Sequence, residues 1–443
     1  MRVPSYPSYK RSGVEWLGDV PEHWDWKRLR YVTLRADEKV EADEDMPLPY
    51  VGLEHIESWT GRLRQLDSEL VPAGISNRFR PGDTLFGKLR PYLAKACNVD
   101  FEGLCSSELL VLRTAGQDRR FLLYGLLTDG FIALVDQSTY GAKMPRASWD
   151  FIGSCTVPLP PIREQEAIAD FLDRETSRID ALVANKRTLI ERLTEKRTAL
   201  ISRTVTRGLP PDAARAAGLD PHPKLKPSSI DWLGDVPEHW EVKKLGHIAV
   251  VVRGASPRPA GDTRYFDGDF IPWITVGELT KDTSPYLTST ESMLTQDGAG
   301  HSRVMRHGTL ILTNSGATLG VPKILAISGC ANDGVVAFEN VRRDANKLFL
   351  YYFLCSITEN LRDRIRQGSG QPNLNTDIIK ALAVPYPPSV EQSAIVDFLD
   401  RETAKIDQMT AKVQAAIERL QEYRGALITA AVTGKIDVRG ASA

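Results

Sequence analysis

Residues 160–176 read PPIREQEAIADFLDRET, and residues 387–403 read PPSVEQSAIVDFLDRET, so one block of sequence occurs twice in the chain. A second block recurs in the same way, because VEWLGDVPEHW at 14–24 returns as IDWLGDVPEHW at 230–240. Internal repeats of this kind indicate a duplicated structural unit. The intervening stretches resemble each other much less. The chain therefore consists of two nearly identical frames that hold two divergent inserts.

A long helix is predicted after each Pro-Pro pair. Proline suits a helix start, and no Gly or Pro interrupts residues 162–207. Apolar residues recur at seven-residue spacing in both copies, which is typical of a coiled coil. One position of the predicted seam holds Leu172, Ile179, Leu193, Leu200, Leu399, Ile406, Val413, Leu420 and Leu427, and the other holds Leu182, Leu189, Met409, Ala416 and Tyr423. We expect the two helices to pack against each other in antiparallel orientation.

The inserts are predicted to combine helices and strands, because short strand-like runs are broken frequently by Gly and Pro. The expected fold class is α+β, with two globular domains separated by two long antiparallel helices in a coiled coil, and an internal pseudo-two-fold repeat. The predicted boundaries are 1–155 for the first domain, 156–208 for the first helix, 209–383 for a linker and the second domain, and 384–443 for the second helix.

Composition and motifs favour a protein without an active site, a metal site or a membrane span. The five cysteines show no CxxC spacing, which fits a reducing compartment and a cytoplasmic location. No apolar run suggests a signal peptide or approaches the ~20 residues of a membrane span. The chain has neither a GxxxxGK[ST] phosphate loop nor a GxSxG elbow. Its net charge of −1 means that any DNA binding must come from local basic patches.

The paired blocks, in the same order around two variable inserts, resemble the specificity subunits of type I restriction–modification systems. The resemblance covers nearly the whole chain, and PGDTLFGKLRPY at 81–92 is similar to a stretch common in the target recognition domains of that family. It implies that each insert is such a domain and reads one half of a split, asymmetric sequence in double-stranded DNA. It also implies two methylation subunits docked on the repeated helices, together with restriction subunits. S-adenosylmethionine, ATP and Mg would act in those partner subunits, with no cofactor in this chain.

The predicted DNA contacts are loops that match between the copies in position but not in side chain. Lysine and arginine can bind phosphate or guanine, whereas asparagine and glutamine can pair with adenine. The predicted DNA-binding residues are Lys88, Arg90, Lys143, Arg146, Asn314, Ser315, Thr318, Gln371, Asn373 and Asn375. The predicted partner-binding residues on the helices are Phe171, Leu172, Ile179, Phe398, Leu399 and Ile406.

Residues that are identical in both copies are predicted to anchor the frame, because they cannot carry two different sequence preferences. This applies to Trp16 and Trp24 and to their counterparts Trp232 and Trp240. The helix glutamates Glu164, Glu175, Glu191 and Glu195 are predicted to be solvated or to face a partner. A second function stays open at this point, namely a duplicated coiled-coil adaptor that joins proteins and does not bind DNA.

Overall fold

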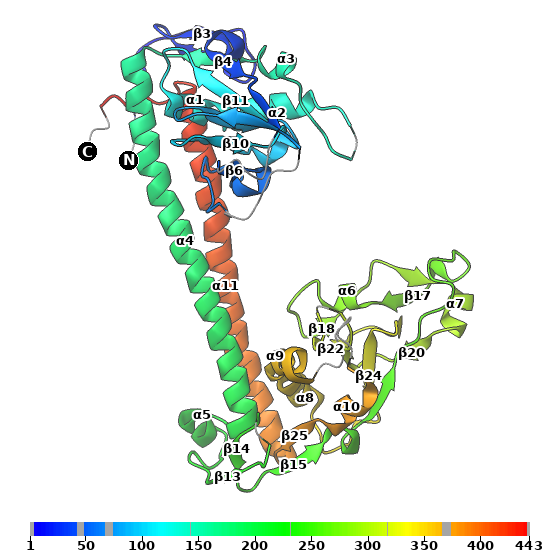
Figure 1. Cartoon of the computed structure of the whole chain (residues 1–443). Helices are drawn as coiled ribbons and strands as arrows, with labels where there is room; N and C mark the ends of the chain where they lie inside the picture. The colour runs from blue at the N-terminus through cyan, green and yellow to red at the C-terminus, as the bar shows by residue number, and fades with distance from the viewer. Residues whose placement is uncertain are drawn as a thin grey trace. The chain divides into compact units, whose positions relative to one another are not determined.

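The structure is a computed structural model that describes residues 4–41, 48–66, 74–141, 143–230, 232–316, 318–365 and 374–440. It divides into two compact units, Met1–Arg187 with Gln414–Ala443 (unit 1) and Thr188–Val413 (unit 2). The long helices α4 (Ile162–Arg207) and α11 (Ser389–Val432) contribute to both units and lie side by side in Figure 1. The predicted long helix at 162–207 and the mixture of helices and sheets are confirmed.

The globular part of unit 1 contains two four-stranded sheets, ordered β5-β7-β10-β6 and β4-β11-β8-β9. The strands are β4 (Thr33–Ala36), β5 (Lys39–Glu41), β6 (Tyr50–Val51), β7 (Ile75–Phe79), β8 (Thr84–Gly87), β9 (Ala96–Asn98), β10 (Gly103–Cys105) and β11 (Leu109–Thr114). Two ribbons, β1 (Tyr9–Arg11) with β2 (Asp19–Pro21) and β3 (Asp25–Arg28) with β12 (Thr156–Leu159), complete the strands. The helices are α1 (Arg119–Leu126), α2 (Asp129–Gln137) and α3 (Trp149–Ile152).

The β4-β11-β8-β9 sheet is covered on both faces, which explains why β8 is apolar without alternation. Leu85 and Val111 join the buried cluster that lies between the two sheets. Phe86 and Leu112 point the other way and join a cluster with Phe131 of α2. Successive side chains of a strand alternate between faces, so a strand buried on both sides needs apolar residues at every position.

Unit 2 repeats this plan with a five-stranded sheet, β16-β24-β21-β22-β18, and a four-stranded sheet, β19-β17-β23-β20. The strands are β16 (Val250–Arg253), β17 (Phe266–Ile274), β18 (Tyr286–Leu287), β19 (Met293–Leu294), β20 (Arg303–Met305), β21 (Leu310–Thr313), β22 (Pro322–Leu325), β23 (Gly329–Ala331) and β24 (Val335–Glu339). The ribbons are β13 (Leu225–Pro227) with β14 (Asp235–Pro237) and β15 (Glu241–Lys244) with β25 (Ala383–Tyr386). The helices are α5 (Pro211–Ala216), α6 (Val276–Leu279), α7 (Gln296–Gly300), α8 (Lys347–Ser356), α9 (Thr358–Asn360) and α10 (Thr376–Ala381).

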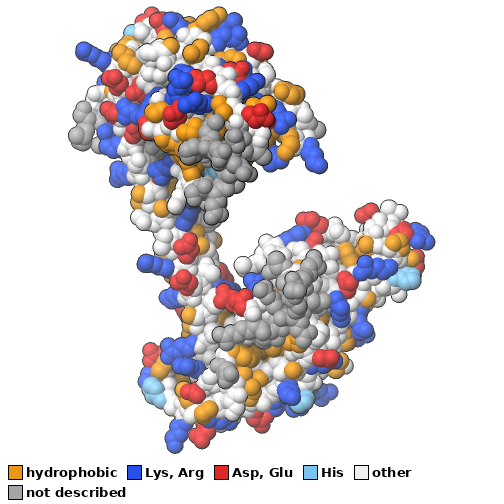
Figure 2. Space-filling model, viewed as in Figure 1, with side chains coloured by type: hydrophobic (Ala, Val, Ile, Leu, Met, Phe, Trp, Pro, Cys, Tyr) orange, Lys and Arg blue, Asp and Glu red, His pale blue; other side chains and the backbone are white. Residues whose placement is uncertain are grey.

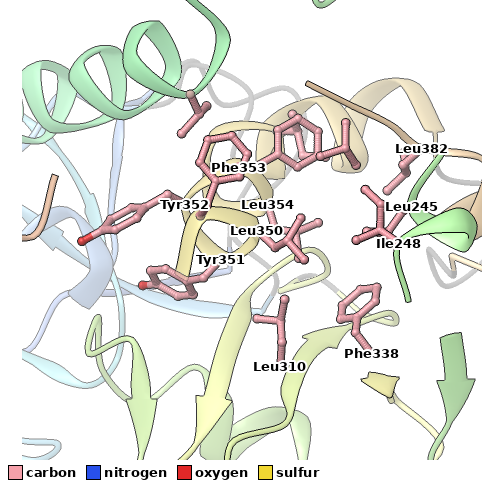
Figure 3. Close-up of a cluster of buried hydrophobic side chains, with 14 of the residues drawn as sticks. Leu245, Ile248, Leu310, Phe338, Leu350, Tyr351, Tyr352, Phe353, Leu354 and Leu382 are labelled. Atoms are coloured by element: carbon pink, nitrogen blue, oxygen red, sulfur yellow. The ribbon is translucent and has the colours of Figure 1, made fainter. Parts of the chain in front are cut away.

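The largest core of unit 2 forms around α8, whose central residues are all buried. Figure 3 shows Leu350 and Phe353 of this helix in the same buried cluster as Leu310 of β21 and Phe338 of β24. A helix that is apolar on every side must be enclosed by other elements, and here the sheet, α4 and α11 all contribute residues to the cluster. The core therefore joins the globular part of unit 2 to its section of the long helices.

The two long helices run in opposite directions. In unit 1, Asp180 of α4 pairs with Arg424 of α11, with 3.0 Å between Oδ1 and Nε. In unit 2, Arg197 of α4 pairs with Asp407 of α11, with 2.9 Å between Nε and Oδ1. From Asp180 to Arg197 the residue number increases along α4, whereas the residue number of the partner on α11 decreases from Arg424 to Asp407. These two pairs are reciprocal, because Arg197 and Arg424 occupy the same position of the repeated block, as do Asp180 and Asp407.

The second position of the predicted seam is wrong. Leu182 and Met409 are 43% and 54% exposed, and Leu189 and Tyr423 also face solvent. Residues four places after the first seam position are buried instead. Val183, four residues after Ile179, and Ile417, four residues after Val413, are examples. In a seven-residue repeat, the second seam position can follow the first by three residues or by four. The exposed leucines suggested three, whereas the buried residues follow by four. The exposed apolar side chains Leu182, Leu189, Met409 and Tyr423 are called the outer stripe below.

A buried carboxylate anchors the first frame to α4. Glu164 accepts hydrogen bonds from Tyr6 Oη at 2.5 Å and from Trp24 Nε1 at 3.1 Å. Its other oxygen lies 2.8 Å from His23 Nε2. Burial and the neighbouring carboxylate raise the pKa of Tyr6. The prediction that Glu164 is solvated or faces a partner is therefore wrong, because this side chain holds the repeated block against the helix.

The next residue of each block clamps the globular part to the same helix. Gln165 Oε1 accepts the backbone N–H of Asp118, just before α1, at 3.0 Å. Gln392 Oε1 accepts the backbone N–H of Asn346, just before α8, at 2.7 Å. Both glutamines are buried, so losing either bond would leave a buried amide unsatisfied. The repeated Glu-Gln pair thus fixes where each insert sits on its helix.

The repeated tryptophans have the anchoring role that was predicted. Trp24 and Trp240 are fully buried. Trp16 packs against Phe131 of α2, with 6.1 Å between ring centroids. Trp232 packs at the same centroid distance, but with a different tilt, against Phe353 of α8. Trp24 and Trp240 are therefore enclosed, and Trp16 and Trp232 are half-buried against their helices.

The segment that follows α11 returns to the first strands of unit 1. Asp437 donates its backbone N–H to the carbonyl of Pro4 at 2.7 Å. Lys435 Nζ donates to the carbonyl of Asp19 at 2.6 Å, and the Arg439 guanidinium lies over the Tyr6 ring. Within the described residues, no helix has both the length and the apolar character needed to cross a membrane.

Candidate DNA interface

Three predicted residues of unit 1 come together at one edge of the sheets. Lys88 follows β8, and its backbone N–H donates to the carbonyl of Glu108 at 3.0 Å. Its carbonyl accepts the N–H of Ala147 at 2.9 Å. Leu89 forms a β-bridge with Arg146, which draws the 88–90 and 145–147 segments together. Lys88, Arg90 and Arg146 are therefore neighbours on one surface, which we call the loop edge of unit 1.

Unit 2 builds the equivalent edge with the same backbone hydrogen bonds. Asn314 follows β21, and its N–H donates to the carbonyl of Gly334 at 2.9 Å. Its own carbonyl accepts the N–H of Leu374 at 2.8 Å. The scaffold of the edge is thus shared, whereas the side chains that it presents differ. That is the arrangement expected of two readers of two different sequences.

The side chains at the loop edge of unit 1 are mainly cationic. Arg90 and Lys143 are exposed, and Lys88 is half-buried. Lys88 lines a cavity of about 160 Å³ together with Arg35 and Lys39 of neighbouring strands and with Asp37, which pairs with Arg35 at 3.0 Å. Positive side chains in a concave site favour a phosphate-bearing ligand. Sequence reasoning missed Arg35 and Lys39, whose alternating charged pattern resembles that of any exposed strand.

Two predicted residues of unit 2 have structural roles, Asn314 in a buried position and Asn375 in an exposed one. Asn314 is 1% exposed, and its amide donates to the carbonyl of Leu374 at 3.2 Å. Asn375 caps the N-terminus of α10, because its Oδ1 accepts the backbone N–H groups of Asp377 and Ile378. The prediction of direct base contact is corrected for Asn314, because a buried side chain cannot reach a groove.

The other predicted residues of unit 2 lie on either side of Asn314 or outside the described residues. Ser315 and Thr318 are half-buried, and the carbonyl of Thr318 accepts the hydroxyl of a strand residue. Gln371 and Asn373 lie outside the described residues. Ser315 and Thr318 therefore keep part of their surface available at the edge.

Two arginines and a serine that sequence reasoning missed extend the edge of unit 2. Arg253 Nε donates to the carbonyl of Asp333 at 2.6 Å. Ser256 Oγ donates to Asp333 Oδ1 at 2.8 Å, and Arg258 Nη2 lies 3.2 Å from Asp333 Oδ2. Asp333 immediately precedes Gly334, so this segment adjoins the shared scaffold. The run RGASPRPAGDTR at 253–264, with three arginines among Gly and Pro, was the signal available in the sequence.

The predicted partner-binding residues lie mostly inside the molecule. Phe171, Leu172, Ile179, Leu399 and Ile406 are buried against other parts of this chain, and Phe398 is partly buried. Side chains already enclosed by their own chain offer little surface to a second one. The outer stripe and the polar faces of α4 and α11 are the surfaces that remain available.

The described residues contain no group of three or more His, Cys, Asp or Glu side chains placed to hold a metal ion. Their five cysteines are all free thiols. Figure 2 shows Lys and Arg side chains interspersed with Asp and Glu over the visible face. The positive loop edges are therefore local features of a surface with little net charge.

Comparison with known proteins gives a consistent result. A family model described as the type I restriction modification DNA specificity domain matches residues 237–419. The EcoDI specificity subunit of Escherichia coli is 29% identical over 155 residues, 34% of each chain. The MjaVIII specificity subunit of Methanocaldococcus jannaschii is 24% identical over 359 residues, 76% of this chain and 75% of that protein. The match to the Escherichia coli EcoKI specificity subunit, at 21% identity, covers 95% of this chain and 90% of that protein.

A solved chain from a study of complex assembly and conformational transition of the type I R-M system has a similar fold. Its TM-score is 0.64 at 20% sequence identity, and the match covers 93% of this chain and 98% of that chain. At this identity the likeness concerns the fold alone.

Proposed function

The chain carries the type I restriction modification DNA specificity domain and is related to the specificity subunits of type I restriction enzymes. From this premise, we propose that the chain selects the DNA sequence on which such a system acts. Each globular part reads one half of a bipartite, asymmetric sequence in double-stranded DNA. The prediction that the chain is not itself an enzyme is confirmed by this kinship, because specificity subunits are the non-catalytic components of these systems.

One observation carries the proposal, namely the scaffold shared by the two loop edges. The hydrogen bonds of Lys88 to Glu108 and of Asn314 to Gly334 are equivalent, yet the side chains at those positions differ completely. Duplication explains the shared backbone scaffold, and divergence toward two different DNA sequences explains the changed side chains. A common reading surface with changed readers accounts for both facts. An adaptor that does not bind DNA would share the scaffold through duplication, but it gives no reason for exposed arginine and lysine side chains at the two edges.

The readers we propose are the exposed or half-exposed side chains of the two edges. Those of unit 1 are Lys88, Arg90, Lys143 and Arg146, with Arg35 and Lys39 in support. Those of unit 2 are Ser315, Thr318, Asn375, Arg253 and Arg258, with Gln371 and Asn373 retained from the sequence. Asn314 positions the edge through Leu374 and is not itself proposed as a reader.

We retain the domain boundaries 1–155, 156–208, 209–383 and 384–443 as part of this proposal, with the helices as an antiparallel coiled coil related by a pseudo-two-fold axis. The reciprocal Asp180–Arg424 and Arg197–Asp407 pairs support that reading. The helix pair then sets the spacing of the half-sites. Four added residues lengthen a helix by about 6 Å, or roughly two base pairs.

The helices also serve as the docking site for two methylation subunits in this proposal. The outer stripe replaces the buried residues as the expected contact, because exposed apolar side chains at regular helical spacing match the apolar face of a partner helix. Restriction subunits would join that assembly in the cytoplasm. S-adenosylmethionine, ATP and Mg would bind to these partners.

Sequencing of methylated bases in the host genome tests the proposal, with deletion of this gene as the control. We expect one bipartite asymmetric motif that disappears on deletion, with its methylated bases about 10 base pairs apart. A methylation pattern that is unchanged by the deletion would contradict the proposed function.

A further inference from the structure

A bidentate ion pair stands at the loop edge of unit 1. Arg146 Nε donates to Glu108 Oε2 at 3.1 Å, and Arg146 Nη2 lies 3.0 Å from Glu108 Oε1. The carboxylate therefore lies along the edge of the guanidinium that Nε and Nη2 form. Within the described part of the chain, the three N–H groups at the far end, two on Nη1 and one on Nη2, donate no hydrogen bond.

The backbone around Arg146 is held as firmly as its side chain. Arg146 and Tyr140 exchange two backbone hydrogen bonds, each of 3.0 Å, and Arg146 also bridges to Leu89. The carbonyl of Glu108 accepts the backbone N–H of Lys88, so Glu108 belongs to the shared scaffold and Arg146 directly precedes Ala147, which also belongs to it. The end of the guanidinium consequently points in a direction fixed before any ligand arrives, which lowers the entropic cost of binding.

The surroundings of the pair have the character of an interface. Tyr140, which is 62% exposed, and Met144 and Tyr92 all present large side chains to solvent. Lys143 and Arg90 are exposed beside them. Exposed aromatic and methionine side chains interleaved with cations are typical of a recognition surface.

We infer that Arg146 reads a guanine in the major groove and that Glu108 is the residue that positions it. This inference rests on the proposed function. Guanine offers two acceptors, O6 and N7, at a spacing that matches the two end nitrogens of arginine. Adenine places a donor where guanine has O6, so the same fork rejects it. A carboxylate 3.0 Å from the guanidinium weakens its attraction for phosphate, which favours a base edge as the ligand.

The positioning device belongs to one half-site. Gly334 occupies the scaffold position in unit 2 that Glu108 occupies in unit 1, and glycine has no side chain to orient a neighbour. We therefore expect the guanine contact of an oriented arginine only in the half-site read by unit 1. Unit 2 is expected to contact the bases of its half-site without a glutamate at this position.

Binding selection from randomised duplexes with the full-length chain in complex with its methylation subunits tests this inference. R146A is expected to lose preference for one guanine in one half-site by about 5- to 150-fold. E108A is expected to lose preference at the same position while overall DNA affinity does not fall, because a negative charge near the phosphates is removed. R146K should behave like R146A, because lysine lacks the fork.

The matched control is the Arg78–Glu102 pair of the same domain. Arg78 and Arg146 side chains are equally exposed, at 41%, and Arg78 also binds a single glutamate. Glu102 precedes β10, whereas Glu108 lies beyond its other end. R78A should leave every base preference unchanged.

The inference is overturned if R146A keeps the guanine, if E108A has no effect where R146A does, or if R78A matches R146A. The complete absence of a bipartite preference in the unaltered complex would instead overturn the proposed function, so the two failures are distinguishable. Thermal stability of each variant, measured alongside, should stay near that of the unaltered chain because both pairs are at the surface.

Discussion

Replacing Arg424 with methionine should destabilise unit 1 by about 3 kcal/mol. The arginine side chain is 9% exposed, and it binds Asp180 as well as the carbonyls of Trp59 and Thr60, at 2.8 and 3.1 Å. Each buried carbonyl left without a donor costs about 1–3 kcal/mol. Asp180 keeps its contact with Arg62 at 3.0 Å, so the carboxylate is not left alone. The expected loss is therefore at the lower end of the range for a broken buried pair.

Arg197 provides the matched control, because it occupies the same position of the other copy. It makes one hydrogen bond to Asp407, which is half exposed. Pairs of this kind contribute about 0–1 kcal/mol, so R197M should cost less than 1 kcal/mol. Both variants replace the same side chain at the same position of the repeated block, and the two sites differ in burial and in the number of acceptors.

Hydrogen exchange of the full-length chain is the suitable assay, because a protein of two units does not unfold in a single two-state step. The amide of Trp59, which bonds to Ala94, reports on the loop that Arg424 holds. R424M should lower the free energy of opening of residues 57–62, and R197M should not. The reasoning is refuted if R424M leaves that opening free energy within about 0.5 kcal/mol of the unaltered chain.

Three further outcomes are expected. L182D should reduce retention of methylation subunits at least tenfold without lowering stability, because the leucine is exposed; S177D on the same helix should leave retention unchanged, and equal retention by both variants would count against the outer stripe. Exchange of residues 241–380 for another insert should change one half-site of the methylated motif, and a change in both would contradict modular reading. Burial raises the pKa of the Cys97 thiol to about 12, so Cys97 in the folded protein should resist alkylation at pH 8. The contribution of this thiol to the stability of the fold should fall as the pH rises from about 9 towards 12. Rapid labelling of Cys97 in the native protein, measured by mass spectrometry, would contradict its burial.

The long helices were predictable because their signals are local. The Pro-Pro pair, the absence of Gly and Pro over 162–207 and the seven-residue spacing all act within a few turns. The second seam position was not predictable from apolarity. Arg197 and Arg424 lie on the buried side because each finds an aspartate on the other helix, more than 200 residues away in sequence. Leu182 lies on the solvent-exposed side of α4.

The equivalence of the two loop edges was predictable from the sequence, whereas the exposure of their side chains was less so. Matching loops between the copies located Lys88 and Asn314 correctly at equivalent edges. Whether a side chain there faces solvent depends on long-range contacts, such as the one that buries Asn314 against Leu374. The same limit applies to Glu164, whose partner Tyr6 is 158 positions earlier.

The return of residues 414–440 to unit 1 has a consequence for the order in which the protein forms on the ribosome. Unit 2 is one uninterrupted segment, 188–413, so all of its own contacts are available once that segment has emerged. Unit 1 has its first 187 residues much earlier, but Asp180 and the buried side of α4 wait for Arg424 and its neighbours. At about 5–20 residues per second, the 226 intervening residues take roughly 10–45 s to synthesise. The half of the protein that is encoded first is thus the half that is completed last, and during that interval its unpaired helix face is open to premature association with another nascent chain.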